Sequence, residues 1–459
     1  MYVSSYLALN TALSGVEAAE EELDTTGNNI SNENTTDYED ESVTLVTSQA
    51  LSVVGGNGNT TQIGTGVEAT GIVNNGNQYL DSAYRAQNAA TSAASTTESY
   101  LEQVQSVVGE SATNTGALSD QLSAFWKDWN DLADNPTDSG AKQAVVDAGE
   151  ELASSISSMS SDIAAVATQA QTQYANLTQD ASGGEVYDDV TQIQRLNKAI
   201  AEATQAGTSD AQLQDQRNAA LDDLSSLADT TVTTNSDGTV NVSFGGITNL
   251  VQGTTVNWPS GSSFTFPGTA STVGGTLGSL LQLTQTGGTI DQLQSQLDGF
   301  ATDLASEVNA PTVDGTATAT DPAFFTITTG GNPGSAAASL AVNPTLVSSP
   351  SSVQTTATSD SGANEIALAE AANSGGTADN SYAAFVEQVG GLTENATETS
   401  TTQSALLTQV TNQRQSAEGV DSSQEMTDLV EEQQAYEASA KVMNTFETMM
   451  DALMQVVGV

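Results

Sequence analysis

The sequence predicts a multidomain, mainly α-helical protein that carries a β-rich outer domain. Three observations lead to this fold class. Both ends of the 459-residue chain carry apolar residues at helical spacing, the span 80–230 does so with little proline, and seven of the eight prolines lie between Pro259 and Pro350. Since proline removes a backbone donor and disrupts helices, the proline-rich span is expected to differ in structure from the rest.

The first predicted helix covers 2–30. Its apolar side chains recur three and four positions apart and form a heptad-like seam of Tyr6, Leu9, Leu13, Val16, Leu23 and Ile30. Near its end, Asn28 and Asn29 weaken the helix, because their side chains compete for backbone hydrogen bonds. Residues 43–80 alternate apolar and polar positions between Gly/Asn clusters, which predicts short strands or extended loops.

Helical periodicity returns over 80–230. Phe125, Trp126 and Trp129 are expected to anchor the core of this region, and 133–140 ("ADNPTDSG") predicts a loop between two helices.

A change of character near residue 230 predicts a β-rich insertion over 231–354. Within it, 231–244 is expected to form a hairpin that turns at Asp237–Gly238 and places three apolar side chains on one face: Val240, Val242 and Phe244. The segment 289–309 inside this span has helical periodicity.

From about 362 the chain is expected to be helical to its end. The last helix, 422–457, carries two adjacent apolar stripes, and a helix of this kind usually has more than one packing partner. One stripe holds Met426, Leu429, Tyr436, Met443 and Met450, and the other holds Val442, Phe446, Met449, Leu453 and Val456. The sequence thus predicts a terminal domain of 1–35 with 422–459, a mostly helical middle domain of 36–230 with 355–421, and the β-rich outer domain of 231–354.

The charge balance is extremely acidic. Lys and Arg number 8 against 57 Asp and Glu, a formal net charge of −49 at pH 7. Binding to nucleic acid or to anionic membranes requires clustered cations, so neither partner is expected. Self-repulsion strains an acidic assembly unless salt or protons relieve it, which points to saline or acidic surroundings.

The chain contains no Cys and no His. Disulfides, thiolate nucleophiles and a Ser-His-Asp triad are therefore excluded, and no catalytic, metal-binding or cofactor-binding residue is predicted. The acid pairs Asp188–Asp189 and Asp222–Asp223 are interpreted as solvated helix faces. No apolar run approaches the roughly 20 residues of a membrane span, and the N-terminal stretch lacks the basic region of a conventional signal peptide.

Both ends resemble one protein family. "SGVEAAEEELDTTGNNISNENTTDY" (14–38) resembles the N-terminal signature of the flagellar axial proteins, the rod, hook and hook-associated family, through Asn28, Asn29, Ile30, Asn32, Asn34, Thr35 and Tyr38. The C-terminal 426–457 resembles the closing helix of that family, through Leu429, Gln434, Ala435, Tyr436, Ala438, Ala440, Lys441, Val442 and Leu453.

Two internal segments refine this resemblance, and a third segment departs from it. "NQRQSAEGV" (412–420) and "LQDQRNAALDDLSSLADTTV" (213–232) look like segments of the members at the hook–filament junction rather than of hook or distal-rod proteins. Where the family commonly has Pro-Gly before the tyrosine and a basic residue after it, this chain has Thr36–Asp37 and the acidic "EDES" of 39–42.

The resemblance implies a structural, non-enzymatic role in the extracellular flagellum. The terminal helices would pair as a coiled coil lining an axial channel, with the middle domain outside it and the β-rich insertion facing solvent. Subunits would self-associate into a ring that contacts the hook protein and a second junction or filament protein. Export would be unfolded, through the flagellar type III apparatus, after a cytoplasmic chaperone has masked the C-terminal helix.

The predicted assembly interface gathers the residues that carry the two apolar seams and the two family signatures: Tyr6, Leu9, Leu13, Val16, Leu23, Asn28, Asn29, Ile30, Asn34, Tyr38, Met426, Leu429, Gln434, Tyr436, Val442, Met443, Phe446, Met450 and Leu453. Two alternatives stay open. One is another axial protein of the hook or distal rod, and the other is a secreted acidic adhesin or enzyme with oligomerising end helices.

Overall fold

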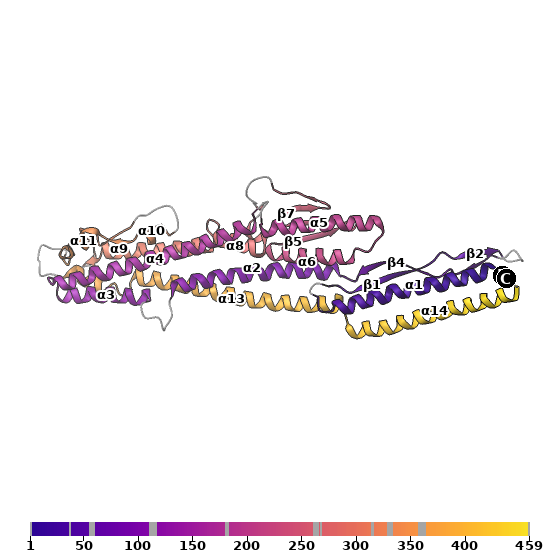
Figure 1. Cartoon of the computed structure of the whole chain (residues 1–459). Coiled ribbons are helices and arrows are strands. Elements are labelled where there is room, and N and C mark those ends of the chain that lie inside the picture. Colours follow the sequence, from indigo (N-terminus) through magenta and orange to yellow (C-terminus); the bar gives the residue numbers. More distant parts are fainter. Residues whose placement is uncertain are drawn as a thin grey trace. The chain divides into compact units, whose positions relative to one another are not determined.

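The computed structural model describes residues 2–35, 38–54, 60–109, 117–179, 183–259, 266, 269–313, 316–327, 334–356 and 364–457. The chain forms two compact units (Figure 1). The terminal unit comprises Met1–Ala89, Asp180–Pro267 and Ala405–Val459, and the central unit comprises Ala90–Gln179 and Gly268–Ser404. Among the described helices, none combines the length and apolarity that a bilayer crossing requires.

The central unit is built mainly from helices. Two of them, α2 (Gln78–Val108) and α13 (Thr377–Glu418), also contribute residues to the terminal unit. The other helices of the central unit are α3 (Leu118–Asp134), α4 (Ser139–Leu177), α7 (Ala270–Val273), α8 (Gly275–Thr284), α9 (Thr289–Asn309), α10 (Ser335–Ser339), α11 (Pro344–Ser348), α12 (Glu365–Ala371) and the 3-10 turn η1 (Pro350–Ser352). Its strands form two short antiparallel pairs: β9 (Thr312–Val313) with β10 (Thr316–Ala317), and β11 (Phe325–Thr326) with β12 (Ala341–Val342).

The core of the central unit surrounds the aromatic residues of α3, as the sequence predicts. Phe125, Trp126 and Trp129 are fully or almost fully buried, and Phe125 has both Phe324 and Phe325 within 6 Å, at ring-centroid distances of 5.7 and 5.8 Å. The indole of Trp126 donates a hydrogen bond to Asp379 Oδ2 at 2.8 Å, which supplies the polar partner that a buried indole requires. The α3–α4 connection lies where the loop 133–140 is predicted, and the Asp138 side chain caps α4 by accepting hydrogen bonds from backbone N–H groups.

The body of the terminal unit is a helix pair packed on a four-stranded antiparallel sheet. The helices are α5 (Glu185–Ala206) and α6 (Ala211–Leu227), and the strand order follows the sequence: β5 (Thr230–Thr234), β6 (Val240–Phe244), β7 (Ile247–Gln252) and β8 (Thr255–Val256). The predicted hairpin is confirmed, with a tight turn in which Gly238 takes a positive φ of 79°. Val240, Val242 and Phe244 are buried on one face, as expected.

The two ends of the chain form the rest of the terminal unit. α1 (Tyr2–Asn32) packs on α14 (Ser422–Val457) and on a long β-hairpin whose arms are β1 (Glu41–Thr47), β2 (Leu51–Val54), β3 (Thr60–Ile63) and β4 (Val67–Asn74). β1 pairs with β4 and β2 pairs with β3, both antiparallel. Figure 1 shows α1 beside α14.

The segment 231–354, expected to be one β-rich outer domain, has a different structure. Its strands β5–β8 belong to the terminal unit, whereas α7 to α11 belong to the central unit. The helix predicted at 289–309 is α9, and it contributes Leu293, Leu297, Phe300 and Leu304 to the core of the central unit. The proline-rich composition marks many short connections, but these connections link helices that pack on α4.

Candidate assembly site

The face of α1 that is buried within the chain consists of small and polar side chains. Ala12, Ala18, Ala19, Thr25 and Thr26 are all buried. Small side chains allow two helices to approach closely. A Cβ added to Gly15 of α1 would lie only 3.0 Å from Ser439 Oγ of α14, so the two backbones are near each other at this point. Farther along, Thr26 Oγ1 donates a hydrogen bond to Glu432 Oε1 at 3.1 Å.

The predicted apolar seams are largely left uncovered by this packing. Leu9 and Leu13 on α1, and Met426, Tyr436, Val442 and Met450 on α14, are exposed, and Met426 is the most open of them at 57%. A further set of predicted residues is half-buried: Val16, Leu23, Ile30, Leu429, Met443 and Phe446. Gln434 and Asn34 are exposed. The side chains of Tyr6 and Leu453 are not among those that the structure describes.

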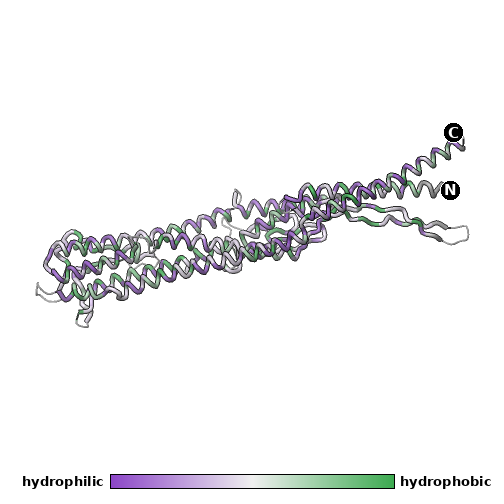
Figure 2. Tube along the Cα trace, turned by 90° about the horizontal axis from the view of Figure 1, so that it is seen from below, coloured by the Kyte–Doolittle hydropathy of each residue, from purple (hydrophilic) through white to green (hydrophobic). Residues whose placement is uncertain are grey.

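The β-hairpin adds more exposed apolar surface beside α1. Leu45, Val46, Leu51, Ile63 and Val73 are exposed, and apolar segments alternate with polar ones along the hairpin in Figure 2. A groove of about 490 Å³ lies where α1, the hairpin and α14 meet, lined by Leu7, Ala8, Thr11, Ala12, Ile63, Gly64, Ser439, Val442 and Phe446. Among the described residues, no charged side chain lines this groove. Contiguous exposed apolar surface of this kind marks interaction sites in soluble proteins.

The Asn-rich end of α1 and the segment that follows it, residues 28–41, are held together by side-chain hydrogen bonds; this region is called the joint. α1 continues past Asn28 and Asn29 to Asn32, because the amide nitrogens of these two side chains donate to groups outside the helix and do not compete with its backbone hydrogen bonds. Asn29 is buried; its amide nitrogen donates to Asp40 Oδ1 at 2.6 Å and to Glu425 Oε2 at 3.1 Å. Its amide oxygen accepts from the Glu41 N–H at 3.1 Å and from the Tyr38 hydroxyl at 2.8 Å. One asparagine thus links α1 to both α14 and the segment leading into β1.

The joint is anchored to α2, α6 and α13 by a buried ion network around Arg414. Its Nη1 lies 2.5 Å from Asp222 Oδ2, and its Nε lies 3.0 Å from Asp81 and 3.1 Å from Glu418. Arg85 pairs with the other oxygen of Asp222 at 2.7 Å. Glu39, one residue after Tyr38, accepts a hydrogen bond from Asn218 of α6 and lies 3.9 Å from Arg414.

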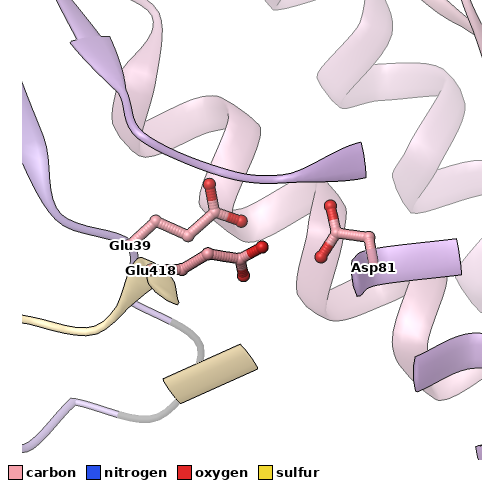
Figure 3. Close-up of side chains that lie close together, drawn as sticks. All are labelled: Glu39, Asp81 and Glu418. Carbon is pink, nitrogen blue, oxygen red and sulfur yellow. The ribbon is translucent and has the colours of Figure 1, made fainter. Parts of the chain in front are cut away.

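Three carboxylates of this network converge: Glu39, Asp81 and Glu418 (Figure 3). One oxygen of each lies within 4.8 Å of the others, a spacing that a divalent cation could bridge. Burial raises the pKa of all three, while Arg414 opposes the shift in each. The pKa of Arg414 itself would be lowered by burial, but Asp222 and Asp81 raise it above its usual value. The guanidinium thus supplies the positive charge that a metal would otherwise provide.

The structure corrects one interpretation and adds residues that the sequence did not reveal. The expectation that Asp222 lies on a solvated helix face is wrong: Asp222 is 5% exposed and binds two arginines. The network residues Glu39, Asp81, Arg85, Arg414 and Glu418 were not predicted as a site. A usable signal was present, since a chain with only 8 cations has little reason to bury three arginines unless they neutralise acids.

Comparisons with known proteins match three parts of the chain to flagellar axial proteins. Residues 9–38 match the model of the flagella basal body rod protein, residues 101–325 match that of the flagellar hook-associated protein FlgK helical domain, and residues 411–456 match the C-terminal model of the flagellar basal body rod FlgEFG proteins. The two short matches contain the joint residues Asn28 and Asn29 and the network residue Arg414.

Individual relatives agree with these models. The chain is 29% identical over 224 residues to flagellar hook-associated protein 1 of Bacillus subtilis and 29% identical over 219 residues to that of Escherichia coli. These stretches cover 48% and 47% of this chain but only 43% and 38% of the relatives.

A solved structure is also similar, that of the flagellar hook junction protein FlgK from Burkholderia pseudomallei. It matches at 23% identity with a TM-score of 0.44, over 54% of this chain and 47% of that one. By the family models at both ends and in the middle, together with the curated relatives, the chain resembles the flagellar rod, hook and hook-associated axial proteins, and among them the hook-associated proteins.

Proposed function

We propose that this protein is a structural subunit of the bacterial flagellum, without enzymatic activity, that forms the junction ring between hook and filament. The observation that carries the proposal is the exposed apolar surface of α1 and α14. These helices pack on each other, yet Leu9, Leu13, Val442 and Met450 remain exposed. In a chain of net charge −49, apolar faces are the surfaces on which further copies can pack with the least repulsion.

In this proposal α1 and α14 form a coiled coil that lines an axial channel. The close approach at Gly15 and the bond between Thr26 and Glu432 support pairing along their length. The proposed assembly interface consists of the seam and signature residues named from the sequence. The rest of the chain would lie outside the channel.

The proposed partners are other copies of this chain, the hook protein and a second junction or filament protein. Export would be unfolded through the flagellar type III apparatus to the extracellular flagellum. A cytoplasmic chaperone would mask α14 before export, and the exposure of Met426, Val430 and Met449 supports a need for such masking.

Two alternatives are less well supported. A hook or distal-rod role would not call for the helical span of α2 to α6, which the helical-domain match covers in large part. An acidic adhesin or enzyme would need convergent acids in 230–360. The carboxylates that do converge among the described residues, Glu39, Asp81 and Glu418, lie outside that span and are bonded to Arg414.

Deleting 422–459 tests the proposal. We expect a soluble chain that leaves hooks without filaments, because α1 loses its helical partner and the assembly its main apolar faces. Electron microscopy of cells that produce only the truncated chain measures the outcome. Normal filaments on such cells would refute the junction role.

Point variants separate the loss of assembly from the loss of a helix. Met426→Gln with Met450→Gln changes two side chains that are exposed in the single chain. We expect this double variant to reduce the number of filaments about tenfold or more. The control, Gln433→Ser with Thr448→Ser, changes exposed polar positions on the same helix and should leave the filament number unchanged.

Self-association is expected to strengthen with salt. At 0.1 M salt charges act over about 10 Å, and at 1 M over about 3 Å, so repulsion between acidic copies fades. We expect the dissociation constant measured by light scattering to fall about tenfold over this range. Glu17→Gln with Glu21→Gln, two exposed acids of α1, should shift the same association to lower salt. A dissociation constant that changes neither with salt nor in this variant would contradict the expectation.

A further inference from the structure

Asp215 of α6 and Asn74 of β4 form a buried pair that the ion network does not include. Asp215 is 8% exposed, and its Oδ1 accepts a hydrogen bond from Asn74 Nδ2. The same Nδ2 donates to the Ala211 carbonyl at 3.2 Å, so Asn74 ties the hairpin to the first turn of α6. The two remaining side-chain oxygens, Asp215 Oδ2 and Asn74 Oδ1, are both buried without a hydrogen-bond partner.

These two unpartnered atoms are complementary if Asp215 carries a proton. An ionised carboxylate only accepts hydrogen bonds, and so does an amide oxygen, so neither can satisfy the other. A protonated Oδ2 donates, and the Asn74 oxygen can accept that hydrogen. The pair then becomes a cyclic acid–amide dimer with two hydrogen bonds, and the penalty of two buried orphan acceptors disappears.

The charges around Asp215 favour the proton. The largest electrostatic effects on it come from Glu39 and Glu41, which are themselves buried, and the ionisable Tyr38 lies on the same segment. Burial first, and then these two acids, raise the pKa of Asp215 to about 8, although the hydrogen bonds that its carboxylate accepts from the Glu39 backbone and the Asn74 side chain act in the opposite direction.

The nearby cations are directed elsewhere. Arg217, on α6 itself, donates to the Gly238 carbonyl, while Arg85 and Arg414 are bonded to Asp222. Of the strands packed on α6, β4 carries only the exposed Glu68 and β5 carries no charged residue. The helix α5 also packs on α6, and its charged residues are Glu185, Asp188, Asp189, Arg195, Lys198 and Glu202.

We propose that Asp215 and Asn74 form a proton-operated latch that fastens the hairpin and the 38–41 segment to α6. With the proton bound, the cyclic pair closes and one of three neighbouring negative charges is removed. Without it, three buried carboxylates repel one another and the hairpin loosens from α6. Because Asn29 bonds the same segment to α1 and α14, the latch sets how firmly the terminal helices are held at the joint.

The sign of the pH dependence follows from linkage. The unfolded chain loses this proton near pH 4, and the folded chain holds it up to about pH 8. The stability that the latch contributes is therefore fully present at low pH, falls between about pH 4 and pH 8, and is level above that.

The variant Asp215→Asn tests the latch, because an amide can form the same cyclic pair at any pH. Between pH 5.5 and pH 8.5 the melting temperature of the full chain is expected to fall in the unaltered protein. We expect this fall to be about 5 °C larger than in the variant. Glu68→Gln, an exposed acid of β4, is the control and should keep the full pH dependence. Equal pH dependence in all three proteins would overturn the proposal.

Infrared spectroscopy gives a second readout, which reports the bound proton itself rather than the stability of the protein. The unaltered protein should show a protonated carboxyl band at pH 6.5 that disappears as the pH passes 8. Asp189, whose pKa burial and neighbouring acids raise to about 7, contributes a band of its own, so the component missing in Asp215→Asn assigns the signal. A spectrum in which the variant lacks no such component would also overturn the proposal.

Discussion

Replacing Arg414 by alanine is expected to lower the free energy of unfolding of the terminal unit by about 3–5 kcal/mol. Arg414 is 8% exposed, and its guanidinium contacts Asp81, Asp222 and Glu418, with Glu39 at 3.9 Å. Removing one partner of a buried ion pair costs far more than the pair contributes, because the other partner stays buried and uncompensated. Here four carboxylates would share the single remaining guanidinium of Arg85.

The measurement is amide hydrogen exchange resolved by peptide. Exchange should accelerate in α6, in the C-terminal turns of α13 and at the joint of 28–41. Arg195→Ala is the matched control, because Arg195 is exposed on α5 and its loss uncovers no buried acid. Lower pH should partly rescue Arg414→Ala, since burial already raises the pKa of Glu39, Asp81 and Glu418. If both variants exchange at the same rate, the network is not a source of stability.

The secondary structure was largely predictable because its signals are local. The periodicity of 289–309 predicted α9 to the residue, and the Asp237–Gly238 turn predicted the β5–β6 hairpin. The failure over 231–354 was one of assignment: proline marked the connections correctly but could not show that α9 completes a core with α3 and α4. Such long-range packing depends on residues more than a hundred positions apart.

The candidate site was predictable only in part, for a physical reason. Periodicity finds an apolar face, but it cannot tell a face that packs within the chain from one reserved for a neighbour. On α1 the intrachain face is Ala12, Ala18, Ala19 and Thr26, whose small side chains hardly register as apolar. The stronger seam of Leu9 and Leu13 remains exposed. Arg414 meets partners from three distant parts of the sequence, and no local pattern encodes such a meeting.

A second substitution, Phe125→Ala, is expected to destabilise the central unit by about 3–5 kcal/mol. Phe125 is fully buried and lies within about 6 Å of four other aromatic rings: Trp126, Trp129, Phe324 and Phe325. Truncating it leaves a cavity among rigid rings that cannot move in to fill it. The variant therefore loses the transfer free energy of the buried ring and is further destabilised by the cavity. Tyr79→Ala is the control, since this aromatic side chain is 79% exposed and its removal opens no cavity.

The two substitutions together test whether the chain has two separate cores. The aromatic cluster belongs entirely to 90–179 with 268–404, and the ion network belongs entirely to the terminal unit. Phe125→Ala should therefore accelerate exchange in α3, α4 and α9 and leave α6 protected, while Arg414→Ala should do the reverse. Under the proposed assembly role, this separation would let the joint loosen while the central core stays folded. Identical exchange patterns in the two variants would show instead that the chain unfolds as one cooperative unit.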